Sequence, residues 1–280
     1  SRDNQFRELR IPAPRGLIKD REGRVLAENL AACEVSLATR TLTRNPRILP
    51  ELAEHLGYEQ DALRERVESG RDQGRHRVVL DRDLGKERIL LLEERIGDLP
   101  GLALQDWARR SYPREELAAH LLGYVGEVRD DEVNPDRRNP RAYRAGDLIG
   151  RSGIEATYET FLRGADGKEM ILVNARGTQL ETVQLLPPEP GHDVILTLDL
   201  ELCAELDSAL ASWGAGAGLV MDVRSGEILA AASRPSFDPN LLVGGIPEAL
   251  WRELIEDPGK PLFNRIAQAS YAPGSAFKPL

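Results

Sequence analysis

The sequence predicts an α+β fold that contains more than one domain. Two stretches, 12–27 and 217–233, each hold two short apolar runs around a turn with a glycine, which is typical of an antiparallel hairpin. Other stretches carry apolar residues three and four positions apart, as amphipathic helices do. The proline-rich stretch 187–191 lies between two such parts and indicates a linker.

Composition limits the classes of function. The chain has 280 residues, of which 41% are hydrophobic and 30% are charged, so it is long enough for two domains with substantial cores. Its net charge of -9 argues against binding to nucleic acid or to anionic lipid. The two cysteines lie far apart and the four histidines form no i, i+4 pair, so we expect neither a metal site nor another cofactor. The sequence shows no run of about 20 apolar residues and no signal peptide.

The first hairpin is expected within 12–27. Its two strands flank the turn Asp20-Arg21-Glu22-Gly23, and a glycine at the turn relieves the steric limit on a left-handed backbone.

The stretch 45–122 is expected to alternate between helices and strands and to carry no chemistry. Asn45 is expected to cap a helix whose first residue is Pro46. The apolar face of this helix would consist of Ile48, Leu49, Leu52 and Leu56. Further helices are expected at about 60–69, 85–96 and 115–122, and strands at 77–80 and 102–112. For His120, a hydrogen-bonded structural role is favoured over a catalytic one.

Another helix is expected after Ser152. Its hydroxyl would cap the helix in a capping box with Glu155, and Gly164 would end it. The predicted apolar face consists of Ile154, Tyr158, Phe161 and Leu162. A strand is expected at 168–174. A phosphate-binding loop is excluded, because no Gly-Lys-Ser/Thr follows a glycine-rich run.

Beyond 187–191 the sequence becomes more apolar. We expect a buried strand at 194–199, then a helix capped by Asp199 that extends through Ser212. The hairpin at 217–233 is expected to have two mostly buried strands. Its preceding glycines come before a strand instead of after one, which excludes a dinucleotide-binding motif.

A possible nucleophile lies near the end of the sequence, where Ser275 and Lys278 form a Ser-x-x-K tetrad. On a helix, positions i and i+3 share one face, so the Lys278 amine can reach the Ser275 hydroxyl and take its proton. Pro273-Gly274 would place Ser275 at a helix N-terminus, where backbone N–H groups favour a developing oxyanion. A solvated lysine near a helix start is the simpler interpretation if the tetrad is considered alone.

Several stretches in order resemble motifs of the class B penicillin-binding proteins. Residues 15–23 resemble the Arg-Gly-x-Ile-x-Asp-Arg-x-Gly signature of the pedestal, and residues 150–155 its Gly-x-x-Gly-x-Glu motif. Residues 235–240 and 263–265 resemble the start of the transpeptidase domain, with the Ser-x-x-K tetrad after them. The string that ends at Gly177 is more similar to the elongation type than to the division type.

The resemblance implies a domain plan and a site. A pedestal domain would occupy 1–190, with a head lobe inserted at about 40–147. Residues 191–280 would begin a transpeptidase domain, an antiparallel sheet flanked by helices, and stop after the tetrad. Ser275 would be the nucleophile and Lys278 the general base of a D,D-transpeptidase that cross-links peptidoglycan stem peptides and is acylated by β-lactams. The family's Ser-x-Asn and Lys-Thr/Ser-Gly motifs do not occur in these 280 residues, so the chain as given is expected to be inactive.

The resemblance also implies partners and a location. These are a glycosyltransferase of the SEDS family, RodA type, and an upstream transmembrane helix that anchors the protein with these residues outside the cytoplasmic membrane. Three alternatives remain: a non-catalytic pedestal module that binds and activates the SEDS partner, a division-type enzyme, and a β-lactam sensor or β-lactamase. The last is less favoured, because the pedestal motifs would then serve no purpose.

Overall fold

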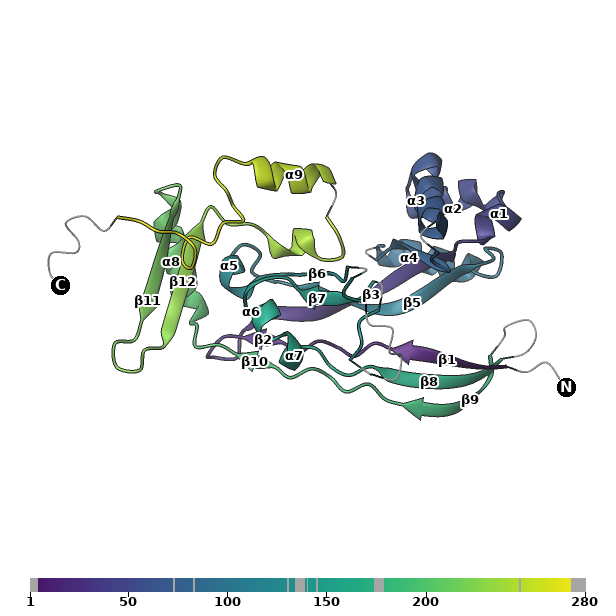
Figure 1. Cartoon of the computed structure of the whole chain (residues 1–280), viewed down its shortest axis with the longest axis horizontal. Coiled ribbons are helices and arrows are strands. Elements are labelled where there is room, and N and C mark those ends of the chain that lie inside the picture. The colour runs from purple at the N-terminus through teal and green to yellow at the C-terminus, as the bar shows by residue number, and fades with distance from the viewer. Residues whose placement is uncertain are drawn as a thin grey trace. The chain divides into compact units, whose positions relative to one another are not determined.

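The computed structural model describes residues 5–272, except 73, 83, 130, 134–138, 140, 145, 174–178 and 247. Helices and small sheets occur together along the chain (Figure 1), which confirms the predicted α+β class. The chain divides into two compact units, Ser1–Glu28 with Arg110–Leu280, and Asn29–Arg109. The second unit and the insertion predicted at about 40–147 have different bounds.

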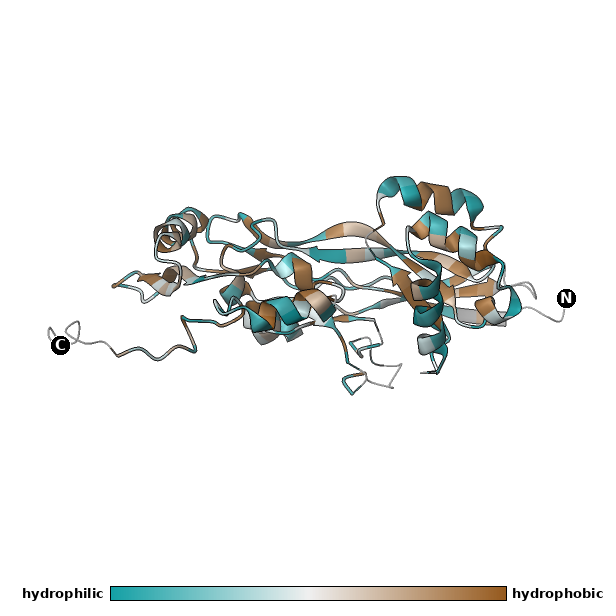
Figure 2. Cartoon of the chain, turned by 90° about the horizontal axis from the view of Figure 1, so that it is seen from above, coloured by the Kyte–Doolittle hydropathy of each residue, from teal (hydrophilic) through white to brown (hydrophobic). Residues whose placement is uncertain are grey.

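The unit Asn29–Arg109 packs helices on a small sheet. Its core contains the predicted apolar face of the helix at 48–56, together with side chains from the strands. Figure 2 shows hydrophobic and hydrophilic residues alternating along these helices. The helices are α1 (Thr41–Arg44), α2 (Ile48–Leu56), α3 (Gln60–Asp72) and α4 (Lys86–Arg95), and the strands are the later part of β3 (Val25–Ala38), β4 (Arg77–Asp81) and most of β5 (Leu102–Ser111). Both β4 and β5 pair with β3.

The start of α2 differs from the prediction. Asn45 does not cap this helix: it ends α1, and its N–H donates to the Thr41 carbonyl at 2.7 Å. Because a short helical turn already precedes it, α2 begins only at Ile48, after Arg47. The predicted apolar face is correct, since Ile48, Leu49, Leu52 and Leu56 are all buried.

The predicted hairpin at 12–27 is confirmed. Strand β2 (Ile18–Lys19) pairs antiparallel with β3, and Gly23 in the turn adopts a φ of 80°. On its other side β2 pairs in parallel with β10 (Val194–Ile195). The strand predicted at 194–199 is therefore shorter than expected, and Ile195 is 68% exposed because β10 pairs only at the end of this sheet.

A second sheet joins three antiparallel strands in the order β1 (Gln5–Ile11), β8 (Gly167–Val173) and β9 (Gln179–Leu186). Strand β8 confirms the strand predicted at 168–174 as far as Val173, and Asn174 lies outside the described residues. The stretch that follows β9 is held in place: Ala165 and Glu189 exchange backbone hydrogen bonds at 2.9 and 2.8 Å, and the Gly191 N–H donates to the Pro14 carbonyl at 3.0 Å.

Short elements connect these sheets: α5 (Ala119–Leu122), β6 (Val125–Glu127), β7 (Leu148–Gly150), α6 (Gly153–Thr157) and α7 (Glu159–Leu162). The helix predicted from residue 115 begins only at Ala119, after a run of turns. The helix predicted after Ser152 is interrupted at Tyr158. Its apolar face is only partly formed, since Leu162 is fully buried but Tyr158 and Phe161 are 39% and 56% exposed.

The remaining elements are α8 (Leu200–Ala211), β11 (Gly216–Met221), β12 (Ile228–Arg234), the 3-10 turn η1 (Pro239–Leu242) and α9 (Glu248–Glu256). Asp199 caps α8 as predicted, accepting from the Glu201 N–H at 3.0 Å. Strands β11 and β12 form the predicted hairpin, but Leu219 and Met221 on β11 are 46% and 51% exposed, so only β12 is mostly buried.

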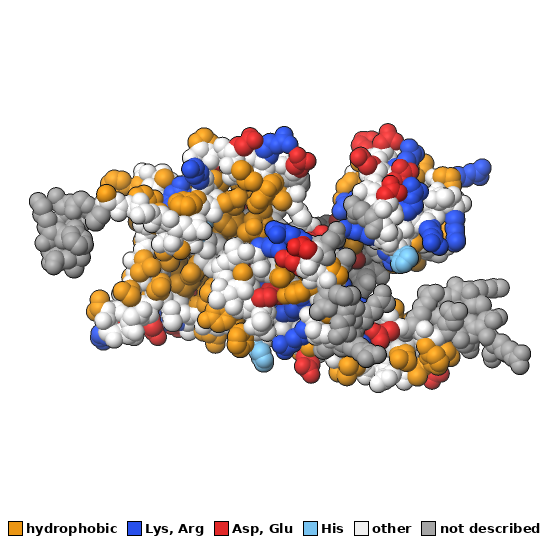
Figure 3. All heavy atoms as spheres, in the orientation of Figure 1, with side chains coloured by type: hydrophobic (Ala, Val, Ile, Leu, Met, Phe, Trp, Pro, Cys, Tyr) orange, Lys and Arg blue, Asp and Glu red, His pale blue; other side chains and the backbone are white. Residues whose placement is uncertain are grey.

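Hydrophobic side chains also gather beside α9, where Figure 3 shows a cluster of them at the surface. The buried members are Ala119, Phe237 and Leu242, with Trp251 and Leu254 of α9 packed against them. Through this cluster α5 packs beside η1 and α9.

Candidate active site

The predicted catalytic residues Ser275 and Lys278 lie outside the described residues. Their roles therefore stay predictions. The structure does describe the segment that leads toward them, up to Ala272, and the two pedestal motifs that the sequence singled out.

The two pedestal motifs meet at a buried carboxylate. Glu155 is completely buried, and its Oε2 accepts from Nε of Arg15 at 2.7 Å. Its Oε1 accepts from Nε of Arg110, which is also buried, at 2.7 Å and from the Tyr112 hydroxyl at 3.2 Å. Burial, followed by the charge of Glu155, raises the pKa of Tyr112 well above its usual value. The cluster pairs one buried carboxylate with two guanidinium groups and a hydroxyl, and so ties residues distant in sequence together.

A second carboxylate extends this network. Glu159 accepts from Nη2 of Arg15 at 2.7 Å, from the Tyr143 hydroxyl at 2.6 Å and from the Gly150 N–H at 2.8 Å. Burial disfavours its charged form, yet these donors lower the pKa of Glu159 below its usual value. The pKa of Arg15 is raised above its usual value, because the charges and hydrogen bonds of its two carboxylate partners outweigh burial. Both shifts favour the charged form. Arg15 and Glu159 are therefore both charged at neutral pH.

The capping box predicted for Ser152 and Glu155 is wrong. Ser152 is the N-cap residue of α6, but its side chain makes no capping hydrogen bond. Glu155 turns into the interior, because two guanidinium groups there offer charge-assisted hydrogen bonds that outweigh one bond to a backbone N–H. Sequence reasoning also missed Arg110, which carries no motif. Its one signal is that a basic residue lies within the strand predicted at 102–112.

The other motif carboxylate, Asp20, joins the first hairpin to α8. Its side chain is fully buried and accepts from the N–H groups of Glu22, Arg24 and Leu200 at 3.0, 2.8 and 3.2 Å. The Arg24 side chain donates to Asp20 at 2.6 Å and to Asp199 at 3.1 Å. Although burial opposes ionisation, these hydrogen bonds lower the pKa of Asp20 below its usual value.

The lowered pKa predicts how stability depends on pH. Because the folded pKa lies below the usual 3.8, Asp20 stabilises the fold above about pH 4, and this contribution is lost as pH falls toward the folded pKa. Thermal unfolding should therefore show that Asp20→Asn lowers Tm at pH 7, with a difference that shrinks on acidification. Asp61→Asn serves as the control, since the Asp61 side chain is 95% exposed. A Tm difference that stays constant between pH 7 and pH 3 would contradict the prediction.

His120 has the structural role predicted for it. It is buried, and its Nε2 lies 2.7 Å from the Pro261 carbonyl oxygen. Since a carbonyl only accepts, Nε2 carries the proton. Burial lowers the pKa of His120 below its usual value, which keeps the ring neutral at pH 7.

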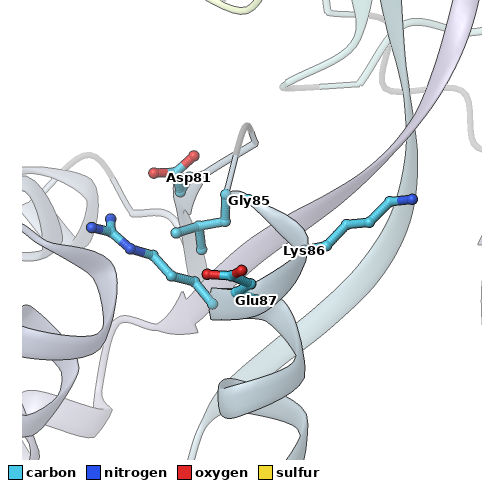
Figure 4. A pocket seen from close by; sticks show the side chains of 6 residues that line it. Asp81, Gly85, Lys86 and Glu87 are labelled. Carbon is cyan, nitrogen blue, oxygen red and sulfur yellow. The ribbon is translucent and has the colours of Figure 1, made fainter.

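A surface pocket lies in the unit Asn29–Arg109, and two of its polar side chains already have partners. It is lined by Asp81, Leu84, Gly85, Lys86, Glu87 and Arg88. Asp81 accepts from the Tyr58 hydroxyl at 2.7 Å, and Arg88 donates to the Leu56 carbonyl at 3.0 Å. Lys86 points away from Asp81 (Figure 4), so the two do not form a pair that could act on a ligand.

Within the described residues, no group of three or more His, Cys, Asp or Glu side chains is arranged to hold a metal ion. The same residues include no helix with the length and apolar character that crossing a bilayer requires.

The chain belongs to the penicillin-binding proteins. A family model for the penicillin-binding protein dimerisation domain matches residues 10–196, and a model for the penicillin binding protein transpeptidase domain matches residues 216–280. The family that the sequence motifs predict is thereby confirmed.

Its relatives include the peptidoglycan D,D-transpeptidase MrdA of Escherichia coli strain K12, which is 33% identical over 285 residues, covering 100% of this chain and 44% of the relative. MrdA of Haemophilus influenzae is also 33% identical, over 100% of this chain and 43% of the relative. Penicillin-binding protein 3 of Bacillus subtilis is 29% identical, over 99% of this chain and 40% of the relative. The chain thus spans less than half the length of these curated relatives.

Solved structures agree with this assignment. The chain resembles PBP2 of Helicobacter pylori in a complex with MreC, with a TM-score of 0.82 and 28% identity, covering 98% of this chain and 52% of that one. It also resembles H. pylori PBP2 solved alone, with a TM-score of 0.75, 28% identity and coverage of 98% and 51%.

Proposed function

We propose that this chain is the dimerisation region and the first part of the catalytic domain of a peptidoglycan D,D-transpeptidase. The observation that carries the proposal is the match of the transpeptidase domain to residues 216–280, because this range includes the Ser275–Lys278 tetrad. The names of the MrdA relatives support the same reaction.

In this reaction Lys278 takes the proton of the Ser275 hydroxyl while Oγ attacks the carbonyl carbon between the two terminal D-alanines of a stem peptide. The C–N bond breaks, terminal D-alanine leaves with a proton on its amine, and an ester to Ser275 remains. An amine of a neighbouring stem then attacks the ester carbonyl carbon, the C–O bond to Ser275 breaks, and the serine oxygen regains a proton as the amide cross-link forms. The Ser275 N–H would stabilise the oxyanion; losing one such donor typically costs about 10²–10³ in rate. A β-lactam forms the same ester by opening its ring, so no leaving group departs.

Intact mass spectrometry before and after incubation with a penicillin tests the proposal. We expect the complete protein to gain one adduct that peptide mapping assigns to Ser275, and the chain of residues 1–280 to gain none, because it lacks the family's other two motifs. An adduct on the 280-residue chain would show that those motifs are not required for acylation. A complete protein without an adduct would overturn the proposed function.

The elongation machinery is the proposed setting. The MrdA relatives, and the H. pylori PBP2 solved with MreC, support an elongation-type enzyme over a division-type one and suggest an MreC-like partner for this chain. We place the chain outside the cytoplasmic membrane, anchored by a transmembrane helix upstream of Ser1. The compact unit Asn29–Arg109 is the proposed head lobe, and the proposed catalytic domain begins after the stretch 187–191.

The proposed SEDS partner would dock on the sheet β1-β8-β9. Leu9 and Leu185 flank Glu169 across this sheet and are 43% and 60% exposed, and Val183 on β9 is 50% exposed. Val183 and Leu185 lie two positions apart on β9, and apolar side chains exposed together on a sheet are typical of an interaction surface.

Leu185→Glu tests this surface. A charge there should reduce stimulation of the SEDS glycosyltransferase at least about tenfold, because burying an unpaired carboxylate in the interface is costly. Penicillin acylation of Ser275 should not change. Leu90→Glu is the matched control, since Leu90 is equally exposed at 60% but lies on α4. Equal stimulation by the unsubstituted protein and the Leu185→Glu variant would contradict the surface.

A further inference from the structure

The 259–265 turn precedes Ser275 in the sequence. It is stabilised by hydrogen bonds within the turn and by hydrogen bonds to two other elements of the same unit. It includes the Asn264-Arg265 pair, which is part of a family motif with no role in the mechanism above. Its contacts are all among described residues, and they fix the position of the turn from which the chain continues toward Ser275.

Arg265 closes the turn on itself. Its Nη2 donates to the Gly259 carbonyl at 2.6 Å, and its Nη1 donates to the carbonyls of Lys260 and Phe263 at 3.1 and 3.3 Å. Because a guanidinium is planar and its donor directions are fixed, these bonds set the relative positions of three carbonyl groups. The turn is therefore a preformed unit.

Strand β12 supports one side of this unit. The buried Ser233 hydroxyl accepts from the Arg265 N–H at 3.1 Å and donates to the Phe263 carbonyl at 3.4 Å. These two bonds tie the end of the turn to the hairpin of the transpeptidase region.

Helix α5 forms hydrogen bonds with the turn through His120. The His120 ring donates to the Pro261 carbonyl at 2.7 Å, and the Asn264 side-chain amide donates to the His120 carbonyl at 3.3 Å. The ring also packs edge-on against Phe237, with centroids 5.2 Å apart. His120 thus binds the turn at two positions, with its side chain and with its backbone.

We propose that His120 is a positioning residue for acylation of Ser275. It orients the 259–265 turn, and through the turn the start of the segment that carries Ser275. This inference rests on the proposed function of Ser275 as the nucleophile. Since His120 lies in the matched dimerisation domain and the turn in the matched transpeptidase domain, the contact also lets the dimerisation region affect the reaction rate. A displacement of about 1 Å at a reacting atom can cost about 10² in rate.

The test compares acylation rates in the complete protein, measured with a fluorescent penicillin well below Tm. His120→Phe keeps the ring and its contact with Phe237 but removes the donor to Pro261, and we expect it to lower the second-order acylation rate about tenfold. His120→Gln, whose amide can donate to the same carbonyl, should restore most of the rate. A variant that only weakens the fold would lower Tm without this pattern.

Two further variants complete the design. Asn264→Asp removes the donor to the His120 carbonyl but keeps an acceptor for the N–H groups of Ile266 and Ala267, so it should also slow acylation even if His120→Phe does not fold. Thr197→Val is the matched control: it loses one hydrogen bond, 2.7 Å long, to the β12 carbonyl of Ile228. Among the described residues the Thr197 hydroxyl forms no hydrogen bond with the turn, so the rate of this variant should not change.

The outcomes separate the two proposals. Unchanged acylation rates in the folded His120 and Asn264 variants would overturn the positioning role and leave the proposed function intact. Absence of any Ser275 adduct in the unsubstituted protein would overturn the proposed function and this inference with it.

Discussion

Replacing Ser275 with alanine is expected to abolish the penicillin adduct of the complete protein. Alanine has no oxygen to form the ester, and no neighbouring group takes its place in the proposed mechanism. Lys278→Ala should keep the nucleophile but slow acylation by about 10²–10⁴, the usual contribution of a general base. Stopped-flow or gel-based labelling with a fluorescent penicillin measures both effects.

The pH profile of labelling separates a base from a merely structural lysine. If Lys278 takes the proton, acylation by the unsubstituted protein falls on the acidic side of the profile as the amine becomes protonated, and Lys278→Ala lacks this limb. His55→Ala is the control, because His55 lies on α2 in the other compact unit. Full-rate labelling of Lys278→Ala would remove Lys278 from the mechanism.

The second large effect is expected at the buried carboxylate of the pedestal motifs. Glu155→Gln keeps the shape of the side chain but leaves the charges of Arg15 and Arg110 without their shared counter-ion. Breaking a buried ion pair by removing one partner typically costs about 3–5 kcal/mol. Urea unfolding, followed by tryptophan fluorescence and circular dichroism, should show a loss of this size.

An exposed ion pair in the same unit provides the control. Glu8 and Lys168 lie 3.3 Å apart, and their side chains are 45% and 27% exposed. Glu8→Gln should cost no more than about 1 kcal/mol, because solvent screens the pair. If Glu155→Gln and Glu8→Gln destabilised the chain equally, the central role of Glu155 would be wrong.

Local elements were predictable because they depend on residues close in sequence. The hairpin turn at Gly23, the cap at Asp199 and the apolar face of α2 follow from hydrogen bonds and periodicity within one or two turns. Predictions failed where two local solutions compete. Asn45 ends α1 instead of starting α2, and Ser152 begins a helix without the capping box.

The family, the fold class and the proposed nucleophile were determined by the sequence alone, because short ordered motifs carry them. Only the tertiary structure decided which distant residues meet: Arg15 and Arg110 at Glu155, Asp20 at α8, and His120 at the 259–265 turn. Arg15 and Glu155 are 140 positions apart, and His120 and Pro261 are 141 apart. At such separations the partner of a charge is set by chain topology and by the cost of leaving a buried charge unpaired, and neither has a signal in local sequence.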